Sequence, residues 1–456
     1  MKILMVRPKP SPETIGLQHV MIVEPLELEI LCALKRDFDT VVILDMIIEK
    51  RTFESFVVEH QPDVLCVSGY ITNVSTMKSY CETAKRISNN ITTIVGGVHC
   101  EVCPEDFEHK DIDYRVVRNG AVIFTDLLNY IDKQKEFPMG VLKKGDTLKD
   151  VQLPAFDFTV PFPDRGAVAK YREHYFYIFH DKVALLKTSF GCPYSCSFCF
   201  CRIITEGIYI QRPLSEIIQE LEQIKEKEIY IVDDDFLVDK KRLQEFIFEI
   251  KHRKIEKHFL VYGRADFIAQ NPEVMHKLAA IGLKTVIVGF ESFSDKVLDA
   301  YNKKTSVEMN KETMKVLHHN NIECFACIII PPEWNRQDFR NMVKIVKSLG
   351  IHFVNLQPLT PLPKTGISFP EDQIIIARTN YEKWDLAHIS VQPTKLSVPE
   401  FYTEILKAYS SIIYNPNVLW KYLTTYKPIM LIKMLVGGFK VSNQYRKKIK
   451  EARQNA

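Results

Sequence analysis

The sequence predicts an α/β protein: a doubly wound parallel sheet, then a partial (β/α)6 barrel, then a mostly helical C-terminal segment. Strand patterns alternate with helix patterns roughly every 20–30 residues near the N-terminus, the alternation resumes for six steps in the middle of the chain, and helical patterns dominate the end. The 456 residues are 46% hydrophobic and 26% charged, which is ordinary for a folded globular protein.

The N-terminal region, residues 1–135, is expected to form the doubly wound sheet. Its expected strands and helices alternate, which predicts parallel strands with right-handed crossovers and ligands beyond their carboxyl ends. A Pro- and aromatic-rich linker, residues 136–180, follows. The expected strands cover 2–8, 40–46, 63–70, 92–99 and 113–120, and the expected helices 25–37, 52–61, 73–88 and 121–132.

The next region, residues 181–370, has six strand–helix steps, too few for a closed eightfold barrel and therefore indicative of an incomplete one. Residues 371–456 are expected to be mostly helical. The expected barrel strands are 183–192, 228–236, 258–266, 284–292, 323–331 and 352–360, separated by helices at 214–225, 240–252, 272–282, 294–320 and 336–350.

Charge and cysteine content narrow the class of protein. The formal net charge of +3 does not indicate nucleic-acid binding. No apolar run approaches a membrane span, and the opening MKILMVRP is too short for a signal sequence. Eleven cysteines without a signal argue against a disulfide framework, so we expect a reducing cytoplasm and some cysteines that bind metal.

The strongest motif is GCPYSCSFCF at 191–200, directly after an expected strand. Cys192, Cys196 and Cys199 have the spacing C-x-x-x-C-x-x-C, which suits an iron–sulfur cluster better than tetrahedral zinc. A four-iron cluster held by three cysteines leaves one iron free for another ligand. Cys201 fits the ligand set poorly and is interpreted as a spare thiol.

This loop, with its aromatic residue and its partial barrel, resembles the radical S-adenosylmethionine superfamily over about residues 180–370. The resemblance implies a [4Fe-4S] cluster whose free iron chelates S-adenosylmethionine and whose electron cleaves it to a 5′-deoxyadenosyl radical. It also implies S-adenosylmethionine contacts, with core packing or ordinary turns as the alternative, for Phe198, Asp234, Arg264, Glu291 and Ser292. LTPLPKT (359–365) resembles the family's TP-x-PGT, with Lys364 where Gly is usual.

The N-terminal region resembles the cobalamin-dependent branch of this superfamily. Matching features are Ser68 near the end of the third strand, Gly96–Gly97 after the fourth, and VGGVHCEVCPEDF…DIDYRVVRNG (95–120). The resemblance implies cobalamin contacts for Ser68, Tyr70, Gly96 and Gly97, and glycines allow such close approach of the backbone. A Gly pair in an ordinary turn is the alternative.

Two departures concern cobalamin. RPKPSPETIG (7–16) lacks the His of the D-x-H-x-x-G motif of methionine-synthase-type domains, so cobalt is expected to have no protein imidazole. His19 and His99 are expected to make ordinary polar contacts. RNGAV (118–122) stands where the family usually reads RGEGE.

The resemblance implies C-methylation of an unactivated carbon, in which one S-adenosylmethionine methylates cobalamin and a second yields the radical. Residues 383–409 resemble the tail of hopanoid C-3 methylases, which implies a lipid, isoprenoid or other natural-product substrate. The alternatives are a radical oxidoreductase or cyclase without methyl transfer, as in anaerobic porphyrin-ring cyclases, and a non-catalytic cobalamin sensor.

The C-terminal tail concentrates positive charge. Residues 421–456 sum to +8 and the rest of the chain to −5. The stretch 418–440 is apolar and aromatic with interspersed lysines, which suits a helix on an anionic membrane surface; the alternative is a basic helix covering the barrel. We therefore expect a cytoplasmic enzyme, with peripheral contact at the inner membrane face as an open question. The expected partners are a small-molecule or lipid substrate and a flavodoxin or ferredoxin, and no nucleic acid.

Overall fold

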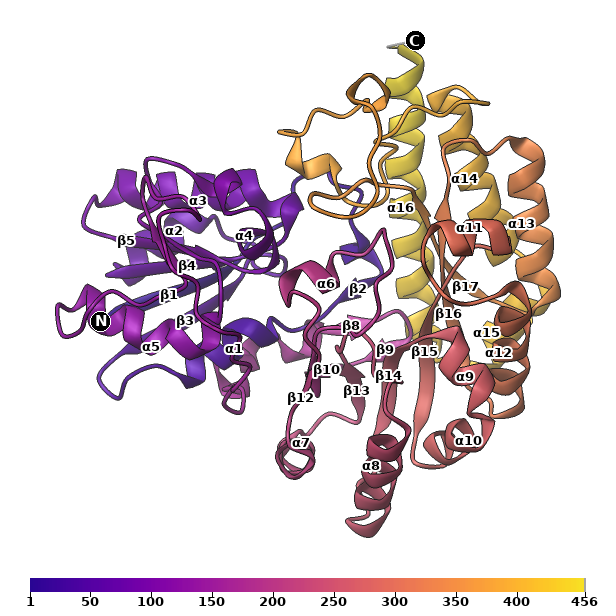
Figure 1. The fold of residues 1–456 in the computed structure, drawn as a ribbon, viewed down its shortest axis with the longest axis horizontal. Helices are drawn as coiled ribbons and strands as arrows, with labels where there is room; N and C mark the ends of the chain where they lie inside the picture. Colours follow the sequence, from indigo (N-terminus) through magenta and orange to yellow (C-terminus); the bar gives the residue numbers. More distant parts are fainter. Residues whose placement is uncertain (455–456) are drawn as a thin grey trace.

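The computed structural model describes residues 1–454, in which two parallel sheets lie beside one another (Figure 1). The N-terminal sheet has the order β3-β1-β4-β5-β6-β7, and only β7 is antiparallel to its neighbour. The predicted doubly wound sheet is therefore confirmed. Its strands are β1 (Lys2–Arg7), β3 (Thr40–Asp45), β4 (Val64–Ser68), β5 (Thr92–Gly96), β6 (Tyr114–Val116) and β7 (Val141–Lys143).

Helices cover both faces of this sheet. The helices α2 (Phe53–His60), α3 (Val74–Ile87) and α4 (Val98–Val102) bury apolar side chains on one face. On the other face lie α1 (Leu26–Ala33) and α5 (Gly120–Ile131). Because both faces are covered, the strands read as continuous hydrophobic runs rather than as alternating patterns.

The linker contributes more structure than expected. Within it, β7 extends the N-terminal sheet and the helical turns of η4 (Arg165–His174) pack on its α1/α5 face. The segments β2 (Met21–Ile22), β8 (Phe176–Tyr177) and β9 (His180–Asp181) form a small antiparallel sheet.

A buried charge network holds the linker to both domains. Arg165 donates to Glu24 (2.6 Å) in the N-terminal domain and to Glu220 (2.8 Å) in the barrel. Arg172 also donates to Glu24. Each buried carboxylate therefore has a cationic partner, as buried charges require.

The second sheet has the order β10-β13-β14-β15-β16-β17 with every pairing parallel, which confirms the predicted partial barrel. Its strands are β10 (Ala184–Leu186), β13 (Glu228–Ile231), β14 (His258–Gly263), β15 (Leu283–Glu291), β16 (Glu323–Ile330) and β17 (Phe353–Pro358). Its outer helices are α7 (Leu214–Gln223), α8 (Lys240–His252), α10 (Pro272–Ala280), α12 (Val307–His319) and α13 (Arg336–Ser348).

Several short elements were not expected from the sequence, because two to six residues carry too little periodicity to be recognised. They include α4, α6 (Cys201–Ile204), α9 (Ala265–Gln270) and the hairpin of β11 (Ser189–Phe190) and β12 (Ile210–Gln211). The expected helix at 294–320 is instead two helices, α11 (Asp295–Ala300) and α12.

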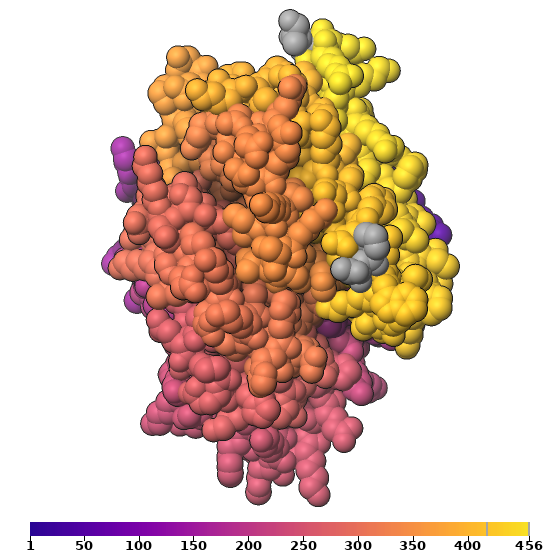
Figure 2. Space-filling model, turned by 90° about the vertical axis from the view of Figure 1, so that its right-hand side faces the viewer, coloured from indigo at the N-terminus to yellow at the C-terminus, as the bar shows by residue number. Residues whose placement is uncertain are grey.

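The C-terminal region contains α14 (Val398–Ile413), α15 (Pro416–Thr425) and α16 (Pro428–Gln454), as predicted. The helix α14 packs on α13 and β17 and continues the outer layer of the barrel. The helix α16 packs on α14 and on η1 (Leu17–His19). Figure 2 shows these last helices in yellow along one side of the molecule. Within residues 1–454, no helix is both long and apolar enough to cross a membrane.

Candidate functional site

The predicted cluster ligands lie on one loop at the mouth of the barrel. Cys192, Cys196 and Cys199 are between β11 and α6, beyond the carboxyl end of β10, and all three are half-buried. Gly191 begins the loop with φ +77°, and a Cβ there would lie 2.0 Å from the Ile208 carbonyl oxygen. Glycine is therefore required where the β11–β12 hairpin closes on the loop.

Backbone hydrogen bonds hold this loop from two sides. The Ser197 N–H donates to the Tyr301 carbonyl (2.9 Å), and the Gly366 N–H donates to the Ser197 carbonyl (2.8 Å). The Asn302 amide donates to the Ser195 carbonyl (2.8 Å). The loop is therefore fixed by segments that follow β15 and β17, which pre-positions its thiols.

Two cations lie against the loop. Arg264, which follows β14, places Nη1 3.7 Å from Cys196 Sγ and its guanidinium 3.8 Å from the centre of the Tyr194 ring. Lys303 is buried, and its Nζ donates to Glu291 (2.8 Å). Burial raises the pKa of Cys196, and the charges of Lys303 and Arg264 oppose that rise. This field favours thiolates, the form that binds iron.

The residues present fit a three-cysteine iron–sulfur cluster with an added ligand. Three free thiols lie on one loop beside two cations, and Asp235 Oδ2 and Ser197 Oγ are buried near it without a hydrogen-bond partner among the described residues. Burial raises the pKa of Asp235 to about 7. Buried polar atoms without partners are rare, so a ligand at this loop would have groups to bond.

Cys201 lies close to the loop without being part of the predicted ligand set. A hydrogen bond from the Cys201 thiol holds the pKa of Cys199 below its usual range. Asp234, one of the predicted S-adenosylmethionine contacts, also bonds to Cys201. Asp234, in the segment after β13, thus contacts the cluster loop.

The other predicted contacts divide into two groups. Phe198 packs edge-on against Tyr301, with 5.5 Å between the ring centres. Lys303 Nζ lies 5.8 Å from the centre of the Phe198 ring, so Phe198 lies beside the Lys303–Glu291 ion pair. Ser292 is buried and its hydroxyl accepts from the Ser294 N–H (3.2 Å), a local turn contact.

Both carboxylate oxygens of Asp233 accept hydrogen bonds from the protein itself. The donors include the Thr188 N–H (2.6 Å) and the Ser189 hydroxyl (2.7 Å). Lys303, Tyr194 and Asp235 were missed by sequence reasoning. Lys303 lies in an unremarkable lysine-containing turn, and no local signal could have found it.

The predicted cobalamin contacts come together at the edge of the N-terminal sheet. Ser68 ends β4 and Tyr70 follows it, and Gly96 ends β5 and Gly97 follows it. Gly97 has φ +94°, and a Cβ there would lie 2.8 Å from both the Gly69 carbonyl oxygen and Ser68 Oγ. Only glycine permits this close approach of the two loops.

The two edges lie close together, because the charges of Asp234 and Cys201 act on Tyr70 and the charge of Tyr70 acts on Tyr262. Tyr70 is 62% exposed, yet burial raises its pKa to about 12, with the charges of Glu27, Asp234 and Cys201 acting on it. Tyr262 on β14 is in the same state: it is 37% exposed, and burial raises its pKa. The helices α4 and α6 are in contact, which joins the N-terminal domain to the barrel beside these edges.

Both departures from the family pattern at glycine positions are explained by the structure. Lys364 has φ +63° and Asn119 has φ +53°, so each adopts the left-handed conformation that glycine would supply. The Lys364 ammonium donates to the Val102 carbonyl at the end of α4. The Asn119 side chain donates to the Ala155 carbonyl (2.7 Å) in the linker. Each side chain ties two parts of the chain together.

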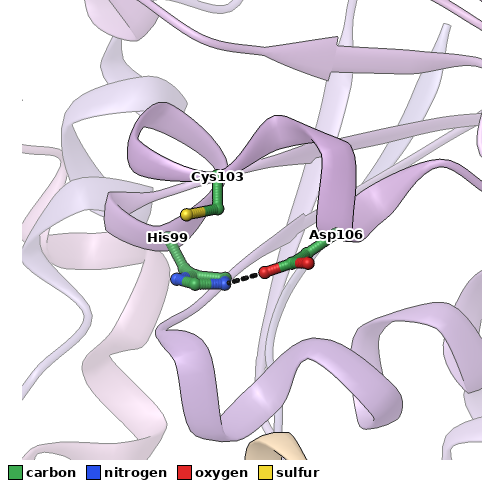
Figure 3. Close-up of side chains that lie close together, drawn as sticks. All are labelled: His99, Cys103 and Asp106. Atoms are coloured by element: carbon green, nitrogen blue, oxygen red, sulfur yellow. Dashed lines mark hydrogen bonds and ion pairs between the residues drawn. The ribbon is translucent and has the colours of Figure 1, made fainter. Parts of the chain in front are cut away.

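His99 is buried beside Cys103 and Asp106 (Figure 3). Its Nε2 bonds to Asp106 (2.8 Å), which also accepts from the Tyr381 hydroxyl (3.0 Å). The three potential ligand atoms lie within 4.8 Å of one another, a set that a metal ion could use. As placed, the imidazole and carboxylate satisfy each other, so His99 makes a polar contact within its own domain.

Comparisons with known proteins assign a family to the N-terminal domain and to the barrel. The model of the B12 binding domain matches residues 14–128, and that of the radical SAM superfamily matches residues 186–346. These matches confirm the predicted [4Fe-4S] cluster, S-adenosylmethionine and cobalamin as cofactors. The roles of the individual residues stay predictions.

Among curated proteins, the chain is similar to the hopanoid C-3 methylase of Methylococcus capsulatus, at 27% identity over 92% of this chain and 81% of that protein. It is also similar to the anaerobic magnesium-protoporphyrin IX monomethyl ester cyclase of Rubrivivax gelatinosus, at 22% identity over 79% and 67%.

Among solved structures, the fold matches the radical S-adenosylmethionine methyltransferase TsrM of Kitasatospora setae with cobalamin and a [4Fe-4S] cluster bound. The TM-score is 0.70 at 16% sequence identity, over 100% of this chain and 99% of that one. Both family models are matched, in that order, so the chain combines the B12 binding domain and the radical SAM domain that together make up a cobalamin-dependent radical S-adenosylmethionine enzyme.

Proposed function

We propose that this enzyme C-methylates an unactivated carbon of an apolar substrate such as a lipid or isoprenoid. The observation that carries the proposal is the closeness of two exposed side chains, Tyr70 from the cobalamin side and Tyr262 from the barrel side. A substrate held beside them would lie between the two cofactor edges. The similarity to a hopanoid C-3 methylase over most of both chains supports methyl transfer and this substrate class.

The barrel edge is suited to an apolar molecule. A cluster of apolar and aromatic side chains includes Tyr230 on β13, Leu260 on β14 and Ile287 on β15, with Phe325 and Cys327 on β16 partly buried against it. Because Tyr230, Leu260 and Ile287 are buried, the accessible surface of these five side chains belongs to Phe325 and Cys327. That surface favours hydrocarbon over charged substrates by the hydrophobic effect.

The side chains of this enzyme hold the cofactors in position and are not needed to transfer protons. When bound, the cluster with S-adenosylmethionine supplies a hydrogen-abstracting radical and cobalamin supplies a methyl group. Arg264 and Lys303 stabilise the negative charge of the thiolate loop, and Gly97 lets the backbone approach the corrin side closely. Hydrogen-atom abstraction requires no general base.

A second candidate function is a radical oxidoreductase or cyclase reaction without methyl transfer. Similarity to an anaerobic magnesium-protoporphyrin IX monomethyl ester cyclase favours it, and an aromatic-lined barrel would also accept a flat macrocycle. We further propose that a flavodoxin or ferredoxin supplies the electron, and that the enzyme acts in the cytoplasm and contacts the inner face of the membrane.

The test uses the anaerobically reconstituted enzyme with iron, sulfide, hydroxocobalamin, a reductant, S-adenosylmethionine carrying a trideuterated methyl group, and an isoprenoid lipid extract. We expect 5′-deoxyadenosine together with a lipid product heavier by one labelled methyl group. Formation of 5′-deoxyadenosine with an unlabelled, oxidised or cyclised product would instead establish the second candidate. A Cys196→Ala enzyme controls for uncatalysed chemistry.

A further inference from the structure

The last two helices present an apolar face to the outside of the molecule. We define the C-terminal apolar face by side chains that all point to solvent, with Trp420 70% exposed, Leu423 68% and Phe439 60%. Such a concentration of large exposed apolar side chains on two consecutive helices marks a contact site for another molecule or a membrane. The face consists of Trp420 and Leu423 on α15 and Ile429, Ile432, Leu435 and Phe439 on α16.

This face is separate from the side of α16 that packs on the rest of the protein. The helix α16 already packs on the protein through Met430, Gly437 and Tyr445, and a Cβ at Gly437 would lie 2.2 Å from the His19 carbonyl oxygen. With about 100° of rotation per residue, Ile432 and Phe439 lie on the side opposite to those packed residues. The helix therefore has two apolar sides, and only one is used within the chain.

Positive charge surrounds the face. From residue 405 to residue 450 the chain has nine Lys or Arg and no Asp or Glu. Exposed Lys427 precedes α16 and exposed Lys440 is next to Phe439. Lys433 lies between them and pairs with Asp181 at 3.3 Å. Apolar side chains bordered by lysines match an anionic bilayer, where acyl chains accept the former and headgroups the latter.

This charge pattern disfavours a second copy of the chain as the occupant. A two-fold interface places the same patch of both subunits together, so the lysines around it would face lysines. Residues 405–450 contain no carboxylate to compensate them, and within residues 1–454 only Lys433 of the lysines named above has an acidic partner, Asp181.

We propose that α15 and α16 dock the enzyme on an anionic membrane surface, with the C-terminal apolar face among the acyl chains and Lys427 and Lys440 at the headgroups. This deepens the proposed function, because it names the surface at which an apolar substrate is met.

The test measures co-sedimentation of the reconstituted full-length enzyme with vesicles of phosphatidylcholine alone or with about 30% phosphatidylglycerol. We expect binding to the anionic vesicles only. Changing Trp420→Ser, Ile432→Ser and Phe439→Ser together abolishes it, and Lys427→Gln with Lys440→Gln weakens it about tenfold or more, since each lysine near an anionic surface contributes about 1 kcal/mol.

The matched control changes three exposed apolar residues elsewhere, Phe38→Ser, Val58→Ser and Phe248→Ser, and keeps vesicle binding. Circular dichroism checks that each variant is folded. Equal binding of the face variant and the wild type, or equal binding to neutral vesicles, would overturn the proposal. So would a wild-type dimer that the face variant dissociates without any vesicle binding, which would assign the face to a second copy.

The readout also separates this proposal from the proposed function. A face variant that no longer sediments with vesicles but still methylates a detergent-dispersed lipid supports both. An enzyme that binds vesicles but transfers no methyl group retains the docking surface and refutes the methylase.

Discussion

The Lys364 ammonium donates a hydrogen bond to the Val102 carbonyl, joining the barrel to the cobalamin domain. Lys364 lies in the segment after β17, and Val102 ends α4, the helix that follows Gly97. The same ammonium is 3.7 Å from Glu105. A residue that occupies a glycine position of the family pattern therefore links the two cofactor edges.

Removing this link should weaken cobalamin binding. Lys364→Gly keeps the left-handed backbone but deletes the ammonium, and Lys364→Gln deletes only the charge. We expect both variants to bind cobalamin about three- to tenfold more weakly, the usual range for one ordinary hydrogen bond, because the Lys364 side chain is partly exposed. Titration followed by visible absorbance measures this. Wild-type affinity in Lys364→Gly would show that the link has no role in holding the domains.

The three loop cysteines should be needed to hold the iron–sulfur cluster, and the neighbouring Cys201 should not. Alanine at Cys192, Cys196 or Cys199 should reduce reconstituted iron from about four to below about one per chain, because a four-iron cluster needs all three thiolates. Cys201→Ala should retain the cluster, and buried Cys324→Ala provides a folding control. The assignment fails if Cys201, which bonds to Cys199, proves essential and Cys199 does not.

Gly97 should not tolerate a side chain. Alanine there would place Cβ 2.8 Å from the Gly69 carbonyl oxygen at φ +94°, so we expect a loss of about 1–3 kcal/mol in the free energy of unfolding and loss of bound cobalamin. Gly438→Ala on α16 meets no atom within 4 Å and should stabilise slightly. Thermal unfolding and cobalamin content measure both; a stable, cobalamin-replete Gly97→Ala would contradict the placement.

The Lys303–Glu291 pair should show strong coupling. Lys303→Met leaves the buried Glu291 carboxylate without its cation and should cost about 3–5 kcal/mol of stability. The double variant Lys303→Met with Glu291→Gln should recover much of that loss, because no buried charge then remains. Denaturant unfolding of the four proteins gives the coupling energy, and simple additivity would argue against the pair.

Glu101 on α4 should make stability depend on pH. Burial raises the pKa of Glu101 to about 7, with the charge of Arg118 opposing. Because the folded-state pKa is above that of the unfolded chain, its contribution is fully present below about pH 4.5 and lost as the pH rises through 7.

We expect the wild type to lose about 1–3 kcal/mol more than Glu101→Gln between pH 5 and pH 8. Urea unfolding of the apoprotein at both values measures this difference. Exposed Glu256→Gln should keep the wild-type slope. Parallel slopes for wild type and Glu101→Gln would refute the raised pKa.

Features set by short stretches of sequence were predictable. The spacing of Cys192, Cys196 and Cys199 and the glycines after β5 are local patterns, and the alternation of strands and helices is visible within windows of about ten residues. The expected strand at 92–99 was too long, because Gly97 at φ +94° ends it and α4 begins at Val98.

The sequence by itself determined the two-part fold, the cluster loop and the ends of the strands that carry the cobalamin edge. Only the tertiary structure decided that Lys303 pairs with Glu291 beneath Cys196, that Lys364 reaches Val102, and that the apolar side chains of α15 and α16 point outward. The physical reason is distance along the chain: these contacts join residues on different elements, and side-chain periodicity cannot distinguish the packed side of a helix from an equally apolar free side.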